Sequence, residues 1–256
     1  MRCAVHLQEG LEINTAFTEK WGGAMVSAIL LAAGSGSRMK SKTAKQFLEI
    51  NGKPLLYYSL KIFDASVVDE IVLVTRGNDI DFVKNEIVKK YGFNKVRRIV
   101  AGGKERYDSV ERGIKVCDKR NKLIMIHDTA RPFVTNFMIL DSISTARRCK
   151  ACTVAMPVKD TIKIVNDEGF GIETPDRRRV YQIQTPQTFD RETLVEAYHR
   201  MRISEDIQRG LAITDDTMIV ERYLDIPSKM VEGSYQNIKV TTPEDLAVAE
   251  AFLARK

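Results

Sequence analysis

Short apolar runs alternate with longer amphipathic stretches along most of the chain, and this pattern predicts strands that alternate with helices. The apolar runs expected to form strands are 26–32, 70–75, 96–101, 123–126, 151–158 and 230–231. The stretches with apolar residues at helical spacing are 54–63, 79–91, 107–116, 136–148, 191–203, 214–223 and 243–254. Such an alternation is typical of an α/β fold with a largely parallel sheet that helices cover on both faces.

The alternation breaks after Asp160. Residues 161–165 and a second stretch that ends at Ile183 flank the turn sequence 166–169, which predicts a long β-hairpin at about 160–184. A projecting hairpin cannot bury its own apolar face. We therefore expect this arm to pack on a second copy of the chain.

Polar clusters follow three of the expected strands, at the sheet edge where parallel sheets bind their ligands. The first is the glycine–serine loop 33–37, and four cations come directly after it: Arg38, Lys40, Lys42 and Lys45. Glycines let backbone N–H groups approach a ligand closely, and such a nest suits phosphate oxygens. The spaced cations favour a triphosphate on which negative charge develops. A plain glycine–serine turn beside a solvated basic stretch is the open alternative.

Two common nucleotide-binding loops do not match this segment. Met39 stands where a dinucleotide fingerprint has its third glycine, and no strand with an acidic end follows about 20 residues later. The P-loop pattern of glycine, four residues and Gly-Lys-Ser/Thr is also absent. The sequence therefore does not predict an NAD-binding site or a P-loop NTPase.

The second cluster, 102–109, follows the 96–101 strand and opens a helix. Its glycines permit close approach, so main-chain groups and Ser109 could hydrogen-bond the edge of a base. A glycine turn whose helix is capped by Asp108 or Ser109 is the alternative.

The third cluster follows the 123–126 strand and contains His127, Asp128 and Arg131. An acid at this place can hold Mg²⁺ directly or through water beside a triphosphate, and Arg131 could bind a phosphate. His127 is interpreted as structural, because attack by an ionised phosphate needs no proton abstraction. Asp128 as a plain helix cap remains the alternative.

Lys239 lies at an expected strand end, just before the helix that begins near Pro243. A cation at that position would face a ligand at the same edge of the sheet. Simple solvation at the surface is the alternative.

Composition narrows the classes of partner. The formal charge of +6 suits anionic ligands. No run of five or more cations occurs and aromatic residues make up only 7%, so no nucleic-acid partner is expected. No stretch reaches the ~18 apolar residues of a membrane span, so no membrane partner is expected either.

Four cysteines are too few for a disulfide scaffold in a chain of 256 residues, and their spacing lacks a second close pair for zinc. We interpret them as reduced structural thiols, which predicts a cytoplasmic setting. Residues 1–24 lack the basic and apolar regions of a secretory signal. We expect this N-terminal extension to be disordered or non-native, and 25–256 to form the functional domain.

The clusters together resemble the 2-C-methyl-D-erythritol 4-phosphate cytidylyltransferase family of nucleotidyltransferases. The resemblance runs from Val26 to the C-terminal region, through A-A-G-S-G-S-R-M, K-Q-F, G-G-K-E-R-Y-D-S-V, H-D-T-A-R-P, V-K-D-T-I-K, T-P-Q-T-F and N-I-K-V-T-T-P-E-D-L. It implies a Rossmann-like nucleotidyltransferase fold with a projecting β-hairpin arm. It also implies a homodimer in which the arm lends residues to the neighbouring active site.

The resemblance assigns a role to each matching residue. Those that would bind the nucleotide are Ala32, Ala33, Gly34, Gly36, Gly103, Ser109 and Asp128. Those that would stabilise the reacting phosphates are Arg38, Lys45 and Lys239, with Mg²⁺ near Asp128. Those that would bind the acceptor phosphate are Thr161, Arg177, Thr185 and Arg131, the first two from the other subunit.

The implied reaction is an in-line attack of a methylerythritol-phosphate oxygen on the α-phosphorus of CTP, with release of pyrophosphate. A ribitol-5-phosphate cytidylyltransferase shares the loop, a similar H-D-x-x-R-P segment and the arm, and is the alternative within the class. A nucleotide-binding protein without chemistry is the alternative from another class. The occurrence of Arg38, Lys45, Asp128 and Lys239 at separate strand ends argues against it.

Overall fold

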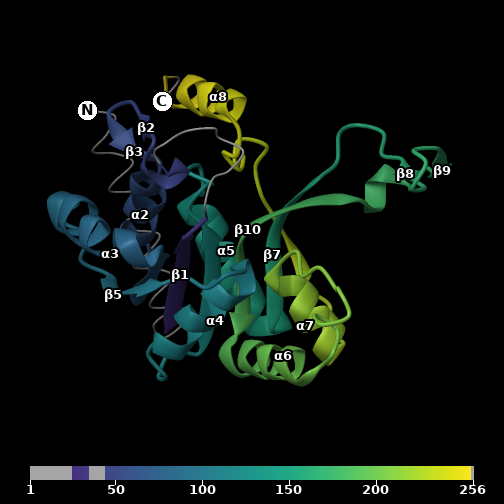
Figure 1. The fold of residues 1–256 in the computed structure, drawn as a ribbon, viewed down its shortest axis with the longest axis horizontal. Coiled ribbons are helices and arrows are strands. Elements are labelled where there is room, and N and C mark those ends of the chain that lie inside the picture. Colours follow the sequence, from purple (N-terminus) through teal and green to yellow (C-terminus); the bar gives the residue numbers. More distant parts are fainter. Residues whose placement is uncertain (1–24, 35–43, 255–256) are drawn as a thin grey trace.

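The central sheet of the protein has seven strands in the order β11-β7-β10-β6-β1-β4-β5, counted over residues 25–34 and 44–254, which this computed structural model describes (Figure 1). The strands are β1 (Val26–Ala32), β4 (Glu70–Thr75), β5 (Val96–Ala101), β6 (Leu123–Asp128), β7 (Ala151–Pro157), β10 (Tyr181–Asp190) and β11 (Lys229–Glu232). Neighbouring strands run parallel except at β10, which is antiparallel to both β6 and β7. The expected mostly parallel α/β sheet is confirmed.

Strand β1 lies inside the sheet, between β6 and β4, and its composition explains why. Ala28 and Leu30 belong to the hydrophobic core on one face of the sheet, whereas Ile29 belongs to the core on the other face. A strand that is buried on both faces has apolar side chains at most of its positions and not only at alternate ones. The buried exception in β1 is Ser27, whose hydroxyl donates to Glu70 Oε1 at 2.6 Å.

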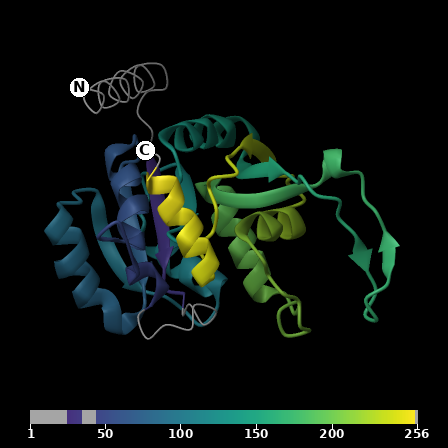
Figure 2. The same ribbon diagram turned by 90° about the horizontal axis from the view of Figure 1, so that it is seen from above.

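Helices cover both faces of the sheet (Figures 1 and 2). The α-helices of the described residues are α2 (Leu55–Ala65), α3 (Ile80–Phe82), α4 (Arg106–Val116), α5 (Asn136–Cys149), α6 (Arg191–Ile203), α7 (Asp216–Leu224) and α8 (Pro243–Ala254). Helix α8 does not cover the sheet but packs in a third apolar cluster with Ile50 and Leu55. Buried residues of α2 and α5 pack in one core cluster, and those of α4, α6 and α7 pack in the other. The helix expected at 79–91 is present, but α3 continues as a π-helix, η4 (Val83–Lys89).

Two parts of the sheet structure differ from the prediction. The expected hairpin ends near 184, yet β10 continues from the arm through Asp190 into the central sheet. A small hairpin of β2 (Glu49–Ile50) and β3 (Lys53–Pro54) also forms around Asn51 and Gly52, both with positive φ. An Asn-Gly pair suits the tight turn of a two-residue hairpin.

The arm between β7 and β10 projects away from the central sheet in both views (Figures 1 and 2). It carries the antiparallel pair β8 (Ile164–Val165) and β9 (Gly171–Glu173) and a 3-10 helix, η5 (Arg177–Arg179). Its apolar side chains are open to solvent: Ile164 is 44% exposed, Phe170 67% and Ile172 65%. The predicted hairpin is confirmed, and its apolar surface is not covered within the described part of this chain.

The described cysteines fit their interpretation as structural thiols. Cys117, Cys149 and Cys152 are free, and burial raises the pKa of both Cys117 and Cys152 to about 12. Among the described residues, no helix combines the length and the apolar composition needed to cross a bilayer. The expected extension, residues 1–24, lies outside the described part of the chain.

Candidate active site

Two cavities open at the carboxyl ends of the parallel strands, and they share Arg106, Asp128 and Lys239. The first has a volume of about 370 Å³. It brings together most of the expected nucleotide and catalytic residues: Ala32, Ala33, Gly34, Lys45, Gly103, Ser109, Asp128 and Lys239. Gly36 and Arg38 lie outside the described residues.

The second cavity has a volume of about 230 Å³ and is lined by Arg131 and Thr185, two residues expected at the acceptor. Thr161 and Arg177 line neither cavity. Both lie on the arm, where Arg177 Nη1 donates to the Lys159 carbonyl at 3.3 Å. This chain therefore keeps Thr161 and Arg177 apart from its own Asp128.

The glycine turn before α4 needs its glycines for close packing. A Cβ on Gly102 would lie 2.5 Å from the Ala33 Cβ, and a Cβ on Gly103 would lie 2.1 Å from the Asp108 Cβ. The Ser109 hydroxyl accepts from the Gly103 N–H at 3.0 Å. The N-cap of the helix is Glu105 rather than Asp108 or Ser109, and Asp108 contributes to the capping box as the side chain that accepts from the Glu105 N–H at 2.9 Å. The turn still lines the first cavity.

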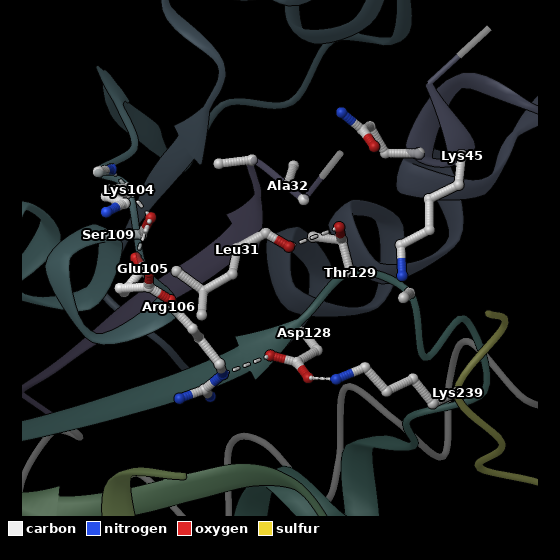
Figure 3. Close-up of a pocket in the computed structure, with 15 residues that line it drawn as sticks. Leu31, Ala32, Lys45, Lys104, Glu105, Arg106, Ser109, Asp128, Thr129 and Lys239 are labelled. Carbon is white, nitrogen blue, oxygen red and sulfur yellow. Dashed lines mark hydrogen bonds and ion pairs between the residues drawn. The ribbon is translucent and has the colours of Figure 1, made fainter. Parts of the chain in front are cut away.

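Asp128, the last residue of β6, is held between two cations (Figure 3). Arg106 Nε lies 3.3 Å from its Oδ1, and Lys239 Nζ lies 2.7 Å from its Oδ2. Burial alone would raise the pKa of Asp128, but Arg106 and Lys239 outweigh it and hold that pKa well below its usual range. Asp128 is thus an ionised group in both cavities and does not cap a helix. Lys239 is correspondingly a cavity residue rather than a purely solvated one.

Arg106 is a cavity residue that the sequence does not predict. It lines both cavities, and its Nη1 donates to Asp216 Oδ2 at 2.7 Å. Asp216 is completely buried and also accepts from the Tyr198 hydroxyl at 2.6 Å. The available signal was the Gly-Gly-Lys-Glu-Arg segment, which places an arginine at the start of a helix beside an expected strand end. Nothing local points to Asp216 as its partner.

His127 is fully buried, as its structural interpretation requires. Its Nε2 lies 3.2 Å from the Arg131 carbonyl, which can only accept, so Nε2 carries the proton. Its Nδ1 then accepts from the Thr185 hydroxyl at 3.0 Å, and that hydroxyl accepts from the Asp128 N–H at 3.1 Å. Burial lowers the pKa of His127 to about 4. The neutral ring therefore holds the end of β6 against β10.

The segment around Lys239 is fastened to the site through its main chain. Arg131 Nη1 donates to the Asn237 carbonyl at 2.8 Å, and the Val240 N–H donates to the Ala130 carbonyl at 2.8 Å. Lys45 Nζ lies 3.4 Å from the Val240 carbonyl. Figure 3 shows Lys45 and Lys239 extending from different segments toward the Asp128 side of the cavity.

The donor groups fit a magnesium ion that a triphosphate brings with it. Over residues 25–34 and 44–254, no group of three or more His, Cys, Asp or Glu side chains could hold a metal by itself. Mg²⁺ commonly uses one or two carboxylates together with substrate phosphates and water. Asp128 supplies one such carboxylate, and because Arg106 and Lys239 occupy both of its oxygens, contact through water suits it better than direct coordination.

Comparison with known proteins gives one consistent result. A family model described as 2-C-methyl-D-erythritol 4-phosphate cytidylyltransferase matches residues 26–255. The enzyme of that name from Caldanaerobacter subterraneus subsp. tengcongensis is 46% identical over 231 residues, which cover 90% of this chain and 99% of the relative. The one from Lachnoclostridium phytofermentans is 47% identical over 228 residues, 89% of this chain and 96% of the relative.

Solved structures agree with the sequence relatives. The 4-diphosphocytidyl-2C-methyl-D-erythritol synthase of Anaerococcus prevotii has a TM-score of 0.78 at 36% identity, and the match covers 90% of this chain and 98% of that one. The 2-C-methyl-D-erythritol 4-phosphate cytidylyltransferase of Thermus thermophilus has a TM-score of 0.69 at 30% identity, and the match covers 89% of this chain and 98% of that one.

Proposed function

The chain belongs to the 2-C-methyl-D-erythritol 4-phosphate cytidylyltransferase family, and we propose that it carries out the family's reaction where its two cavities meet at Asp128. It transfers a cytidylyl group from CTP to 2-C-methyl-D-erythritol 4-phosphate in isoprenoid precursor synthesis, and pyrophosphate leaves. One observation carries the choice of site: Arg106 and Lys239 hold Asp128 at the boundary of both cavities.

CTP would occupy the first cavity. Ala32 ends β1, and Ala33 and Gly34 follow it; none of the three has a large side chain, so their backbone can approach the triphosphate. The turn at Gly103, with the Ser109 hydroxyl behind it, would recognise cytosine. Lys45 would contact the phosphates from the side of the cavity opposite Ser109 (Figure 3). Gly36 and Arg38 are added to this set from the sequence motif alone.

The acceptor would occupy the second cavity, beside Thr185 and Arg131. Thr161 and Arg177 would complete that cavity from a second subunit, because neither lines the two cavities at Asp128 in its own chain. The exposed Ile164, Phe170 and Ile172 of the arm support a homodimer, since apolar side chains gathered on a thin hairpin gain stability by packing on a partner.

Catalysis would consist of positioning and charge stabilisation. The acceptor phosphate is already ionised, so its oxygen can attack the α-phosphorus of CTP in line without a general base. Neutral His127, which is buried and hydrogen-bonded at both ring nitrogens, is not needed as one. Arg106, Lys45 and Lys239 would stabilise the charge that develops on the phosphates as pyrophosphate leaves, together with Arg38.

Mg²⁺ is the proposed cofactor. It would arrive with the triphosphate, be held near Asp128 through water, and neutralise phosphate charge. The described cysteines, Cys117, Cys149 and Cys152, form no disulfide, which supports a reducing, cytoplasmic location.

Pyrophosphate release tests the function directly. The full chain is incubated with each of the four nucleoside triphosphates and with either methylerythritol phosphate or ribitol 5-phosphate, with and without Mg²⁺. We expect rapid release only with CTP, methylerythritol phosphate and Mg²⁺ together. Equal rates with UTP or with ribitol 5-phosphate would contradict the assigned substrates.

A further inference from the structure

A line of hydrogen-bonded side chains leads from the buried interior to Asp128. The Tyr198 hydroxyl donates to Asp216 Oδ1 at 2.6 Å, and Arg106 Nη1 donates to Asp216 Oδ2 at 2.7 Å. Arg106 Nε then lies 3.3 Å from Asp128 Oδ1. Tyr198 and Asp216 line neither cavity, so they would not touch a substrate.

The carboxylate of Asp216 has no evident role in forming its own helix. The N-cap of α7 is Asp215, whose side chain accepts from the Met218 N–H at 2.9 Å. The Asp216 N–H is satisfied by Gln187 Oε1 at 3.0 Å. Asp216 is nevertheless 0% exposed, and its two oxygens are used by Arg106 and Tyr198.

A buried ion pair of this kind adds little net stability, because desolvation offsets much of the attraction between the charges. The ion pair does, however, fix the orientation of the Arg106 guanidinium. The guanidinium is a planar fork, so a carboxylate that holds Nη1 also sets the direction of Nε. The contact of Arg106 with Asp216 is shorter than its contact with Asp128, 2.7 against 3.3 Å, so Asp216 is the stronger determinant of where the guanidinium lies.

We infer that Asp216, supported by Tyr198, is a positioning residue for cytidylyl transfer: it sets the Arg106 guanidinium, and Arg106 in turn orients the Asp128 carboxylate between the two substrates. This inference rests on the proposed function of the Asp128 site. Without Asp216, the guanidinium is free to close on Asp128 with both arms of its fork or to turn into a cavity. Either movement displaces the carboxylate and the Lys239 ammonium bound to it.

Asp216→Asn tests the inference, because the side chain keeps its size and loses its charge. We expect kcat to fall by about tenfold to a hundredfold, the scale of misplacing a reacting group by a fraction of an ångström to an ångström. The KM for CTP is expected to stay within about threefold, since most of the nucleotide contacts are untouched. The amount of folded site is measured in parallel by the stoichiometry of CTP binding, so a loss of folding is not counted as a loss of kcat.

Asp206→Asn is the matched control. Asp206 also lies between an arginine and a tyrosine, accepting from Arg222 Nε at 2.8 Å and from the Tyr223 hydroxyl at 3.0 Å. Its arginine partner, Arg222, lines neither cavity, whereas Arg106 lines both. The kcat of the Asp206→Asn enzyme is expected to stay within about twofold of the wild type, because surface ion pairs such as Asp206 with Arg222 contribute little. An Asp216→Asn enzyme that keeps full kcat per CTP site would overturn the inference. An inactive wild type would instead refute the proposed function.

A double-mutant cycle with Arg106→Lys distinguishes positioning through Arg106 from an independent role. The lysine keeps a charge but has no fork for Asp216 to orient, so adding Asp216→Asn is expected to lower kcat by less than about threefold further. Fully additive losses would show that Asp216 does not act through Arg106. Tyr198→Phe, which keeps the buried charge, replaces Asp216→Asn in the same cycle if the latter does not fold, with an expected loss in kcat of about threefold to tenfold.

Discussion

The ammonium of Lys239 lies 2.7 Å from Asp128 Oδ2, although 111 positions of sequence separate the two residues. The contact joins the segment that follows β11 to the end of β6, and it completes the set of charges shared by the two cavities. Asp128 therefore has one cation on each oxygen, Arg106 from one side and Lys239 from the other.

Lys239→Met is expected to lower kcat by about two to three orders of magnitude, the scale for losing one preorganised electrostatic group. The chain should still fold, because two hydrogen bonds that fasten this segment remain: Arg131 Nη1 to the Asn237 carbonyl and the Val240 N–H to the Ala130 carbonyl. Steady-state pyrophosphate release and circular dichroism give the two readouts. Lys229→Met, which changes an exposed lysine on β11, is the control and should keep wild-type kcat. A normal rate in Lys239→Met would contradict its role at the phosphates.

Lys45→Ala should lower turnover by a similar factor, about two to three orders of magnitude, if its ammonium stabilises the triphosphate. The matched control is Lys53→Ala, a nearby lysine that lies over the Tyr91 ring and lines neither cavity. Comparison of kcat/KM for CTP between the two variants is the measurement. Equal values would remove Lys45 from the proposed set.

Arg177→Ala is expected to raise the KM for methylerythritol phosphate far more than the KM for CTP, because Arg177 lies on the arm and away from the nucleotide cavity of its own chain. Initial rates with each substrate varied in turn measure the difference. Arg179→Ala, a neighbouring arginine on the same short helix, is the control for a general change in the arm.

Mixed dimers of Arg177→Ala and Lys45→Ala subunits test whether the site is shared. If the arm serves the other subunit, each heterodimer has one site with both defects and one with neither. Mixing two nearly inactive proteins should then restore up to about half of the wild-type rate per heterodimer. Exchange of subunits is verified by mass spectrometry of tagged chains. Absence of recovery after verified exchange would mean that each site is built from a single chain.

Stability should fall as the pH drops from 7 to 5, because His127 is neutral in the folded chain. Burial lowers its pKa from 6.5 to about 4, so over this range the unfolded chain binds more protons than the folded one. The linkage gives a loss of about 2 kcal/mol in the free energy of unfolding between pH 7 and pH 5. Urea titrations at the two pH values measure it. In the His127→Gln variant, the free energy of unfolding should fall less between pH 7 and pH 5 than in the wild type. An equal fall in both proteins would show that His127 is not the source of this pH dependence.

The alternation of strands and helices was predictable because the parallel strands are buried on both faces. In β10 the same signal fails. Its segment from Gln184 to Thr188 is mostly polar, yet it is buried in the sheet. Hydrogen bonds replace apolar contacts there, for example between Asn237 Nδ2 and Gln184 Oε1 at 3.0 Å. Hydrophobic periodicity cannot detect a strand whose buried side chains are satisfied by residues far away in sequence.

The residues of the site divide in the same way. Gly103, Asp128 and Lys239 were predicted because each lies in a recognisable segment beside a strand end. Arg106 lies in such a segment but has no distinguishing local pattern, and nothing in the surrounding sequence marks Asp216. Its importance depends on the pairing with Arg106 across 110 positions, which no local pattern encodes.

The order of the site residues along the chain has a consequence for the protein's synthesis. Lys45, Arg106 and Asp128 are made early, the arm and β10 follow, and Asp216 and Lys239 come last. A nascent chain folds from its N-terminal part as it leaves the ribosome. Until the segment with Lys239 has emerged, Asp128 has no cation on its second oxygen and neither cavity has its full lining. The charge arrangement around Asp128 is therefore completed only near the end of synthesis, and a product that stops before Lys239 lacks one of the two cations that contact this carboxylate.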